Sequence, residues 1–336
     1  MTYLMGIDIG GTKTEVSILK MPMDISSHLS LKNLTQWASS GGRPEIIFRE
    51  RVKTLRLKGF EQVMRRIAEL AMTGLQAHNL SADDLMSIGI GMPGPVDPIR
   101  NQMIHGNSAI FVDKDISNTL STRLGFHGKV VCGNDANCFV LAESCIGKAS
   151  HLTAQNPKSC IIGIVLGTGV GGGCFVDGKM LLGKRGSAGE FGHMTLFQNG
   201  HPCYCGQLGC SEQYLSGPAL EAAFTRRIYA QIESRPSANQ IFELAEQFDP
   251  IAMAIVKRYK KHLAQFLSQL SQAFDPHAIV IGGGLSKQPE IYKGIEEMMK
   301  NYLYLPEDGP MVLQNDLGDS AGVVGAAFLP ILNDMM

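Results

Sequence analysis

Near its tenth residue the chain reads Tyr3-Leu-Met-Gly-Ile-Asp8-Ile-Gly-Gly-Thr-Lys-Thr14 and continues as Glu15-Val-Ser-Ile-Leu19. This pattern predicts a strand, a glycine-rich turn and a second strand. The first strand is nearly all apolar, as is typical of a central strand that is covered on both faces. Because glycine has no Cβ, the main-chain amides of such a turn can approach a ligand closely.

The same pattern returns about 160 residues later, where the chain reads Cys160-Ile-Ile-Gly-Ile-Val-Leu-Gly167, then Thr168-Gly-Val-Gly171, then Gly172-Gly-Cys-Phe-Val176. Two copies of one hairpin favour a duplicated α/β lobe. The rest of the chain alternates between predicted strands and predicted helices, which is typical of sheets with crossover helices. We expect strands at 85–91, 129–133 and 277–281, and helices at 59–78 and 252–274.

The segment 22–43 comes after the first hairpin and is polar and rich in serine. We interpret it as a surface insertion or a mobile loop, without a function.

The composition is that of a folded protein with material for two lobes: 336 residues, of which 44% are apolar and 18% charged. A formal net charge of −1 argues against a protein whose main task is to bind nucleic acid or an anionic membrane. Met1 is followed almost at once by the first strand, and no run approaches ~18 apolar residues. We therefore expect a cytoplasmic protein that neither spans a membrane nor binds nucleic acid.

Three glycine-rich turns directly follow apolar strands, and the third is Gly282-Gly-Gly284. Any one of them could be a tight turn in which glycine merely permits positive φ. Three together favour nucleotide binding, with Asp8 close to the metal ion that accompanies the nucleotide. The sequence contains neither a P-loop nor a dinucleotide-binding fingerprint.

Asp135 stands in the motif Asn134-Asp-Ala-Asn137, at the predicted start of a helix. One interpretation is a helix N-cap, which Asp commonly provides. The other is chemical, because Asp135 directly follows a buried strand, where open α/β sheets bind their ligands. A carboxylate there could accept the proton of a substrate hydroxyl, which contributes ~10²–10⁴ in rate.

A dense cysteine cluster, Cys203-x-Cys205-x₄-Cys210, lies downstream of His193. Three thiolates and one imidazole form the ligand set of a closed tetrahedral zinc site, which would be structural because it leaves no open position. The alternative is free or oxidised thiols. The other cysteines lie in apolar contexts and are interpreted as buried thiols: Cys132, Cys138, Cys145, Cys160 and Cys174.

Two carboxylates, Glu190 and Glu212, flank these ligands. An ion that joins His193 to Cys210 would hold them near each other. Paired acceptors suit a polyol, whose hydroxyl groups donate hydrogen bonds. The alternative is two ordinary surface glutamates.

Five motifs, taken in order, resemble those of the ROK family (repressors, open reading frames and sugar kinases). They are Asp8-x-Gly-Gly-Thr-Lys13, Asn134-Asp-Ala-Asn137, Leu166-Gly-Thr-Gly-x-Gly-Gly-Gly173, Gly189-Glu-Phe-Gly-His193 and Cys203-x-Cys-Gly-x-x-Gly-Cys-x-Glu212. The resemblance implies an actin-like, hexokinase-type (ribonuclease H-like) α/β fold of two lobes, with the ligands in the cleft between them and a structural zinc site. It places an N-terminal lobe at 1–134, a larger C-terminal lobe with the zinc motif 193–212 at 135–320, and a helix at 321–336 that packs back on the first lobe.

The resemblance also assigns roles to individual residues. Asp135 corresponds to the catalytic base. The implied sugar-binding residues are Asn134, Asp135, Glu190, His193 and Glu212, together with Asn107, whose segment departs from the expected pattern. The implied ATP-binding residues are Asp8, Gly10, Gly11, Thr12, Lys13, Gly167, Thr168, Gly169, Gly283 and Gly284. The implied ligands of the zinc ion are His193, Cys203, Cys205 and Cys210.

The implied reaction transfers a phosphoryl group from ATP, with Mg²⁺, to the 6-hydroxyl of a hexose. Residues 166–173, 189–194 and 282–286 are most similar to bacterial N-acetylglucosamine kinases. Residues 10–16 and 202–206 are more similar to the family's fructokinases. Glucose and N-acetylmannosamine also stay open as substrates.

The family also contains transcriptional repressors, and a sugar sensor without catalysis is a further alternative. Repressors carry a helix-turn-helix before the first hairpin, whereas the first strand here starts at residue 3 and the chain is not basic. Intact Asp135 and three glycine-rich turns argue against a sensor. The partners that we expect are a hexose and ATP, and a second copy of the chain in a homodimer.

Overall fold

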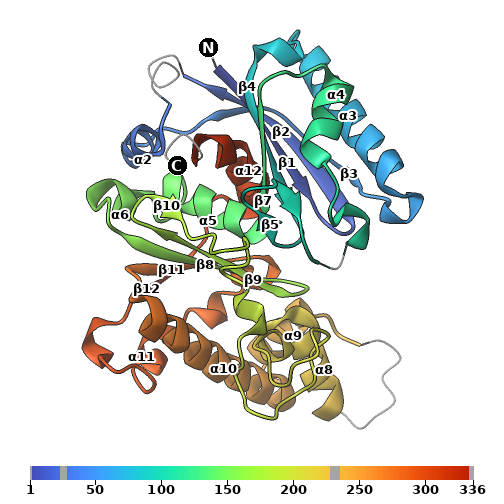
Figure 1. The fold of residues 1–336 in the computed structure, drawn as a ribbon. Coiled ribbons are helices and arrows are strands. Elements are labelled where there is room, and N and C mark those ends of the chain that lie inside the picture. The colour runs from blue at the N-terminus through green and yellow to red at the C-terminus, as the bar shows by residue number, and fades with distance from the viewer. Residues whose placement is uncertain (1, 23–28, 107, 228–234, 333–336) are drawn as a thin grey trace. The chain divides into compact units, whose positions relative to one another are not determined.

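The computed structural model describes residues 2–22, 29–106, 108–227 and 235–332. The chain forms two compact units (Figure 1). The first unit comprises Met1–Ser159, Cys174–Ala188 and Asp319–Met336, and the second comprises Cys160–Gly173 and Gly189–Gly318. The lobe boundaries implied by the resemblance stay a prediction.

The first sheet has the strand order β3-β2-β1-β4-β7. β1 pairs antiparallel with β2 and parallel with β4, and β4 pairs parallel with β7. The apolar run of β1 explains its central position, because both of its faces are covered. A short antiparallel pair, β5 and β6, lies outside this sheet. The strands are β1 (Thr2–Ile9), β2 (Lys13–Met21), β3 (Glu45–Lys53), β4 (Leu85–Met92), β5 (Val96–Asp97), β6 (Gln102–Met103) and β7 (Lys129–Asn134).

The second sheet has the order β10-β9-β8-β11-β12. β8 and β11 are parallel, as are β11 and β12. The two sheets therefore share one arrangement. The order β3-β2-β1-β4-β7 of the first corresponds strand by strand to the order β10-β9-β8-β11-β12 of the second. This confirms the duplication that the repeated hairpin predicted. The strands are β8 (Cys160–Leu166), β9 (Val170–Val176), β10 (Lys179–Met180), β11 (Ala278–Gly282) and β12 (Met311–Gln314).

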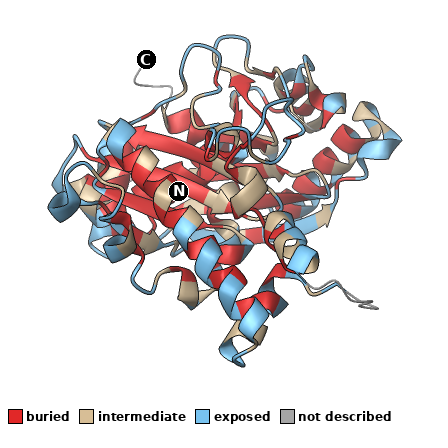
Figure 2. Ribbon diagram, turned by 90° about the horizontal axis from the view of Figure 1, so that it is seen from below, coloured by how far each residue is buried: buried red, intermediate tan, exposed pale blue. Residues whose placement is uncertain are grey.

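Long surface helices such as α3 and α10 bury one face and expose the other, whereas α5 and α12 are buried almost throughout (Figure 2). In the first unit they are α2 (Leu31–Ser39), α3 (Phe60–Ala77), α4 (Ile116–Leu124), α5 (Asp135–Cys145), α6 (Ser150–Gln155) and α12 (Ala321–Leu332). In the second they are α7 (Glu212–Leu215), α8 (Gly217–Arg227), α9 (Ala238–Glu246), α10 (Pro250–Phe274) and α11 (Ile295–Met299). Within the described ranges, no helix has the length and apolarity that a membrane crossing would require. The two helices expected at 59–78 and 252–274 are confirmed as α3 and α10.

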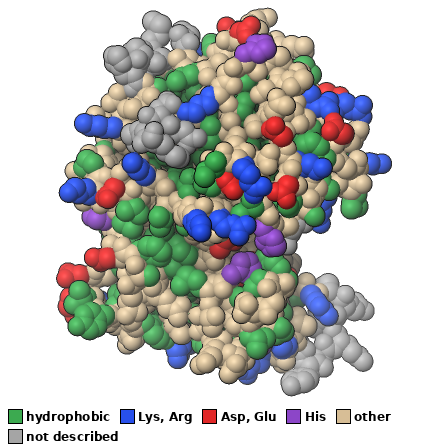
Figure 3. Space-filling model, viewed as in Figure 1, with side chains coloured by type: hydrophobic (Ala, Val, Ile, Leu, Met, Phe, Trp, Pro, Cys, Tyr) green, Lys and Arg blue, Asp and Glu red, His purple; other side chains and the backbone are tan. Residues whose placement is uncertain are grey.

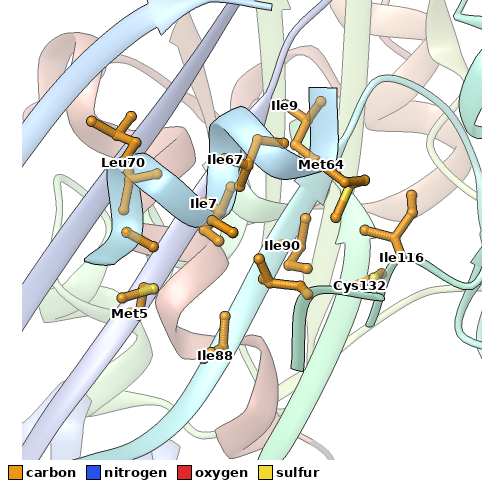
Figure 4. Packing of buried hydrophobic residues seen from close by; sticks show 14 of the residues in the cluster. Met5, Ile7, Ile9, Met64, Ile67, Leu70, Ile88, Ile90, Ile116 and Cys132 are labelled. Atoms are coloured by element: carbon orange, nitrogen blue, oxygen red, sulfur yellow. The ribbon is translucent and has the colours of Figure 1, made fainter. Parts of the chain in front are cut away.

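One face of the first sheet is covered by α3, whose apolar side chains follow helical spacing. Figure 4 shows Met64 and Ile67 of α3 lying over Ile7 of β1 and Ile90 of β4. All four side chains are at most 1% exposed. Burial of such side chains contributes about 1.5–3 kcal/mol each, so this layer fixes how β1 and β4 are held.

The other face of the sheet is covered by α12, which approaches the strands at two glycines. A Cβ placed on Gly6 would lie 1.9 Å from the carbonyl oxygen of Val323, and one on Gly89 would lie 1.6 Å from that of Ala326. Only glycine allows this backbone contact. The close packing of α12 supports the strands whose ends carry the candidate site.

The structure differs from the expectation for residues 22–43. Residues 31–39 form the helix α2, in which Leu31, Leu34 and Ala38 are buried at helical spacing. Ser30 caps this helix by accepting a hydrogen bond from the Asn33 amide. The apolar side chains therefore order a stretch whose overall polarity had favoured a loop, and the part of the interpretation that concerns residues 23–28 lies outside the described residues.

The visible surface carries charges of both signs. On the face that Figure 3 shows, Lys and Arg side chains lie among Asp and Glu side chains. This distribution matches the formal net charge of −1.

Candidate functional site

In the first unit the candidate residues lie where parallel strands end. In the register of the sheet, Asp8 of β1 lies opposite Gly91 of β4, and Met92 lies opposite Asn134 of β7. The carboxyl ends of β1, β4 and β7 therefore meet at one edge (Figure 1). Open α/β sheets bind their ligands at such an edge.

Asn134, and not Asp135, is the N-cap of α5. The Asn134 Oδ1 accepts hydrogen bonds from the amides of Ala136 and Asn137, at 3.0 and 3.1 Å. Asp135 is the first residue of the helix, its side chain is exposed, and its Oδ1 accepts a hydrogen bond from the Ala136 amide at 2.8 Å. The capping interpretation of this motif thus applies to Asn134, and Asp135 presents a carboxylate at the strand edge.

Asp8 is a partly buried carboxyl group close to other acids. Burial, followed by repulsion from Asp135 and Glu15, raises the pKa of Asp8 to about 7, while Arg51 acts in the opposite direction. The register of β1, β4 and β7 places both residues at the same edge of the sheet, which agrees with this repulsion. Such a carboxyl group gains a cation or a proton readily, because either one removes the repulsion.

The sequence alone did not predict the ion pairs formed by Glu15, one of the residues that raise the pKa of Asp8. Glu15 of β2 is 4% exposed and accepts hydrogen bonds from Arg49 and Arg51 of β3. Glu15 lies directly opposite Arg51 in the register of β2 and β3. The alternating charges of residues 49–51 could have indicated ion pairs in this strand. Only the register of β2 and β3 identifies Glu15 as the partner of Arg51.

The first glycine-rich turn is held by Thr54, the residue directly after β3. Its ends are joined by a hydrogen bond from the Gly10 amide to the Lys13 oxygen, at 2.9 Å. The Thr54 hydroxyl donates to the Gly10 oxygen at 2.8 Å, and the Thr54 amide donates to the Thr12 oxygen at 2.9 Å. Thr12 and Lys13 are exposed, as a phosphate-binding turn requires.

A basic side chain adjoins this turn and was also missed. A Cβ on Gly11 would lie 3.7 Å from Arg56 Nη1. A guanidinium group beside main-chain amides is suited to a phosphate group, because it donates several hydrogen bonds in one plane.

In the second unit two glycine-rich turns lie against each other. β8 and β11 are parallel neighbours, so the turns that come after them share one edge of the sheet. A Cβ on Gly283, where φ is +84°, would lie 2.4 Å from the Leu166 oxygen. Gly167 donates a hydrogen bond to the Gly169 oxygen at 3.0 Å and closes the first of these turns. The predicted ATP-binding residues Thr168 and Gly284 are both exposed at this edge.

Glu212 connects this edge to the cysteine-rich segment. Its Oε2 accepts a hydrogen bond from the Val170 amide at 2.9 Å. A Cβ on Gly169 would lie 2.6 Å from the same oxygen. The resemblance assigns Glu212 to sugar binding and residues 167–169 to phosphate binding. Glu212 therefore supports a turn that has a different predicted ligand.

The segments that carry Glu190 and Glu212 pair with each other. The Ser211 hydroxyl donates to the Phe191 oxygen at 2.8 Å, and an isolated β-bridge joins Thr195 to Cys210. Glu190 is exposed, whereas Glu212 is partly buried. Pairing of their segments was the consequence expected of an ion that joins His193 to Cys210.

The four predicted metal ligands come together in the structure. Their ligand atoms, from His193, Cys203, Cys205 and Cys210, all lie within 4.8 Å of one another. The Cys205 and Cys210 sulfurs are 3.6 Å apart, and the Cys203 sulfur is 3.7 Å from His193 Nδ1. Ligands at ~2.0–2.3 Å from a tetrahedral zinc ion are separated by about this distance, so the residues fit zinc.

The chemistry of the thiols agrees with this fit. Burial and the neighbouring Cys205 and Cys203 thiols raise the pKa of Cys210 to about 12. A cation would favour the thiolate form, because its charge offsets both effects. The other five cysteines are buried, as expected from their apolar contexts.

Tyr204 was not anticipated at this centre. Its hydroxyl lies 3.1 Å from His193 Nε2, and the two rings meet edge to face with centroids 5.3 Å apart. A partner on the second ring nitrogen fixes the tautomer of a metal-ligating histidine. A sugar hydroxyl that reaches Nε2 would therefore meet Tyr204.

A cavity of ≈ 330 Å³ adjoins Asn134 in the first unit. Its walls are mostly apolar and include Val96, Met180 and Leu182. Asn137 also lines it, and its buried Oδ1 has no hydrogen-bond partner among the described residues. Because this atom is shielded from solvent, the cavity offers mainly apolar walls to a ligand. The remaining sugar candidate, Asn107, lies outside the described residues.

The raised pKa of Asp8 predicts how stability depends on pH. Because this pKa exceeds that of an unfolded chain, the carboxyl group favours the folded state at pH values below about 4, and this contribution is lost as pH rises through 7. Asp8→Asn should therefore stabilise the protein by about 1–3 kcal/mol at pH 8 and by almost nothing at pH 4. Urea unfolding at both pH values, without Mg²⁺ or ATP, measures this. Asp83→Asn, at an exposed position, is the control, and a pH-independent effect of Asp8→Asn would contradict the prediction.

Removal of the metal should destabilise the protein. A chelator is expected to release about one zinc ion per chain and to lower the melting temperature by about 5 °C or more, because binding energy at such a site is folding energy. Metal analysis and calorimetry measure the two effects. In Cys205→Ser, which lacks one of the four ligands, the chelator should not lower the melting temperature further. Full-length protein that carries no zinc before treatment would count against the site.

Comparison with known proteins places these observations in a family. The family model described as the ROK family matches residues 43–331. An N-acetyl-D-glucosamine kinase of Haemophilus influenzae is 30% identical over 96% of this chain and 98% of its own length. A glucokinase of Halalkalibacterium halodurans is 29% identical over 97% of this chain and 94% of its own length.

A solved structure agrees with the fold. The ROK family glucokinase of Streptomyces griseus, in complex with glucose and AMPPNP, has a TM-score of 0.75 and 28% identity, with coverage of 97% of this chain and 98% of the other. This likeness confirms the predicted actin-like α/β fold class. From its motifs, its duplicated sheets and these matches, the chain belongs to the ROK family.

Proposed function

We propose that this protein phosphorylates the 6-hydroxyl of a hexose. It is an enzyme, an ATP-dependent sugar kinase of the ROK family. The observation that carries the proposal is Asp135, an exposed carboxylate at the N-terminus of α5 and at the edge where three parallel strands end. This is where a base must stand if it is to meet a substrate hydroxyl.

Asp135 acts as the base in the proposed reaction. It accepts the proton of the sugar hydroxyl as the oxygen of that hydroxyl attacks the γ-phosphorus of ATP, and ADP leaves. Asn134 holds the first turn of α5 and so fixes the direction of the neighbouring carboxylate. Positioning contributes most of the rate in phosphoryl transfer, which makes this support as important as the basicity of Asp135.

The glycine-rich turns bind the phosphate groups in the proposal. Main-chain amides of residues 10–13, with Arg56 beside them, bind phosphate groups in the first unit. In the second unit residues 167–169 bind phosphate, and Gly283 and Gly284 bind the nucleoside. Mg²⁺, when bound with ATP, offsets phosphate charge, and Asp8 is the carboxyl group best suited to it because a cation relieves the repulsion around Asp8.

Glu190, His193 and Glu212 hold the sugar in the proposal. The Glu190 and Glu212 carboxylates accept hydrogen bonds from hexose hydroxyls, whereas His193, with Nδ1 on the metal, donates its Nε2–H to a hydroxyl oxygen. The paired segments around Phe191 and Ser211 keep these residues in place. The metal site holds the same segments together, so it shapes the sugar site without taking part in the chemistry.

The preferred hexose in the proposal is N-acetyl-D-glucosamine. The cavity beside Asn134 could receive the acetamido group, since its mostly apolar walls suit the acetyl methyl group. An unsubstituted sugar such as glucose or fructose would leave this apolar space unfilled. The name of the Haemophilus influenzae relative supports this choice, and that of the Halalkalibacterium halodurans relative supports glucose.

A regulator that only binds sugar is the alternative from another class. It would share the sugar-binding carboxylates but would not require a base at the strand edge. Loss of catalysis on removal of the base separates the two functions.

Replacement of the base tests the reaction. Asp135→Asn should lower kcat about 10²–10⁴-fold, because the amide cannot accept the proton, while sugar affinity measured by calorimetry changes little. The matched control is Asp115→Asn at the N-cap of α4, where asparagine can also cap and activity should persist. Near-normal turnover by Asp135→Asn would remove this residue from the role.

A panel of hexoses tests the substrate. The panel comprises N-acetyl-D-glucosamine, glucose, fructose and N-acetylmannosamine. Of these sugars, N-acetyl-D-glucosamine should show the highest kcat/KM. Leu182→Phe, which narrows the cavity, should lower this value about 10-fold relative to that for glucose. Leu181→Phe alters the neighbouring side chain, which does not line the cavity, and should leave the ratio unchanged. A preference for glucose that neither variant alters would exclude the proposed pocket.

A further inference from the structure

The second unit contains a cavity of ≈ 310 Å³ that is separate from the predicted sites. It lies among the cysteine-rich segment, α7, α8 and α10. None of its lining residues belongs to the predicted ATP, sugar or metal sites. Its volume is at the lower end of pockets that hold small ligands, about 300–1,000 Å³.

Two arginines from different helices reach this cavity: Arg226 in the last turn of α8 and Arg258 of α10. Within the described residues, no carboxylate forms an ion pair with either of them. A third arginine, Arg227, is close enough to act on Arg258. Burial, and then repulsion from Arg227 and Arg226, lowers the pKa of Arg258. The protein thus holds like charges together where an anion would relieve them.

Aromatic rings form another part of the lining. The rings of Tyr214 and His201 are stacked with centroids 5.1 Å apart, and Phe197 meets Tyr214 edge to face at 4.8 Å. The Tyr214 hydroxyl accepts a hydrogen bond from the His201 amide at 2.9 Å, which fixes this ring. A flat, rigid apolar surface of this kind suits the carbon skeleton of a ligand and not a bare ion.

His262 also lines the cavity and is neutral at physiological pH; its ring meets those of Phe197 and Tyr214 edge to face, with centroids 4.9 and 5.5 Å apart. Burial, and then the charges of Arg258 and Lys261, lowers its pKa to about 4. It therefore offers hydrogen bonds and no charge. Arg226 and Arg258 carry the permanent positive charge of the lining.

We propose that this cavity binds a phosphate monoester of a small organic molecule of about hexose size. The phosphate group pairs with Arg226 and Arg258, whose planar donors match its oxygens. The organic part lies against Tyr214 and Phe197. Free phosphate shares the first contact but not the second, so the two ligands are distinguishable.

Calorimetry of the full-length, zinc-loaded protein tests this site. The probes are glucose 6-phosphate and inorganic phosphate. Glucose 6-phosphate should bind at least about 10-fold more tightly, since only it has a carbon skeleton to place on the rings. Equal affinities would overturn the assignment of an ester.

Variants locate the binding. Arg226→Gln with Arg258→Gln should weaken the binding of glucose 6-phosphate at this site about 100-fold, because two charge-assisted contacts are lost. The matched control, Lys32→Gln with Lys257→Gln, removes the same charge from exposed positions outside the cavity and should change the affinity less than 2-fold. Arg226 and Arg258 are exposed, so the fold should persist, as circular dichroism can verify. Binding of glucose 6-phosphate that the arginine substitutions leave unchanged would overturn the proposal, whatever the protein phosphorylates.

Discussion

Parallel pairing of β1, β4 and β7 is the constraint on which the candidate site of the first unit depends. It carries Asp8 and Asp135, which are far apart in sequence, to one edge of one sheet. The pairing has an electrostatic cost, visible in the raised pKa of Asp8. The packing of α3 and α12 on the two faces of the sheet supplies the stabilisation that holds these acids in place.

In the second unit one short segment serves several purposes. The four candidate metal ligands hold the segments of Glu190 and Glu212 together, and Glu212 in turn accepts a hydrogen bond from the turn after β8. A metal ion there would therefore affect the two carboxylates that we propose bind the sugar, together with a glycine-rich turn. Tyr204 adds a further contact at His193, on the side of the ring that faces away from the thiols.

The two sheets share a strand order but differ in the residues at the carboxyl ends of their strands. In the first, β7 leads into a helix that begins with a carboxylate. In the second, β11 leads into Gly283 and Gly284, which pack against the end of β8. One topology thus presents an exposed carboxylate in one unit and bare backbone in the other, because the chemistry of a fold is set by the residues at its edges.

Local patterns in the sequence determined the elements and the ligand set. Apolar runs predicted the central strands, helical spacing predicted α3 and α10, and the spacing of Cys203, Cys205 and Cys210 predicted a metal cluster whose members do come together. Tertiary structure alone decided which partners meet: Glu15 with Arg51 across the register of two strands, and Tyr204 with His193. It also decided that residues 31–39 fold as a helix, because their few apolar side chains find a buried surface. Periodicity and spacing act within a short segment, whereas register and burial depend on chain that lies far away in sequence.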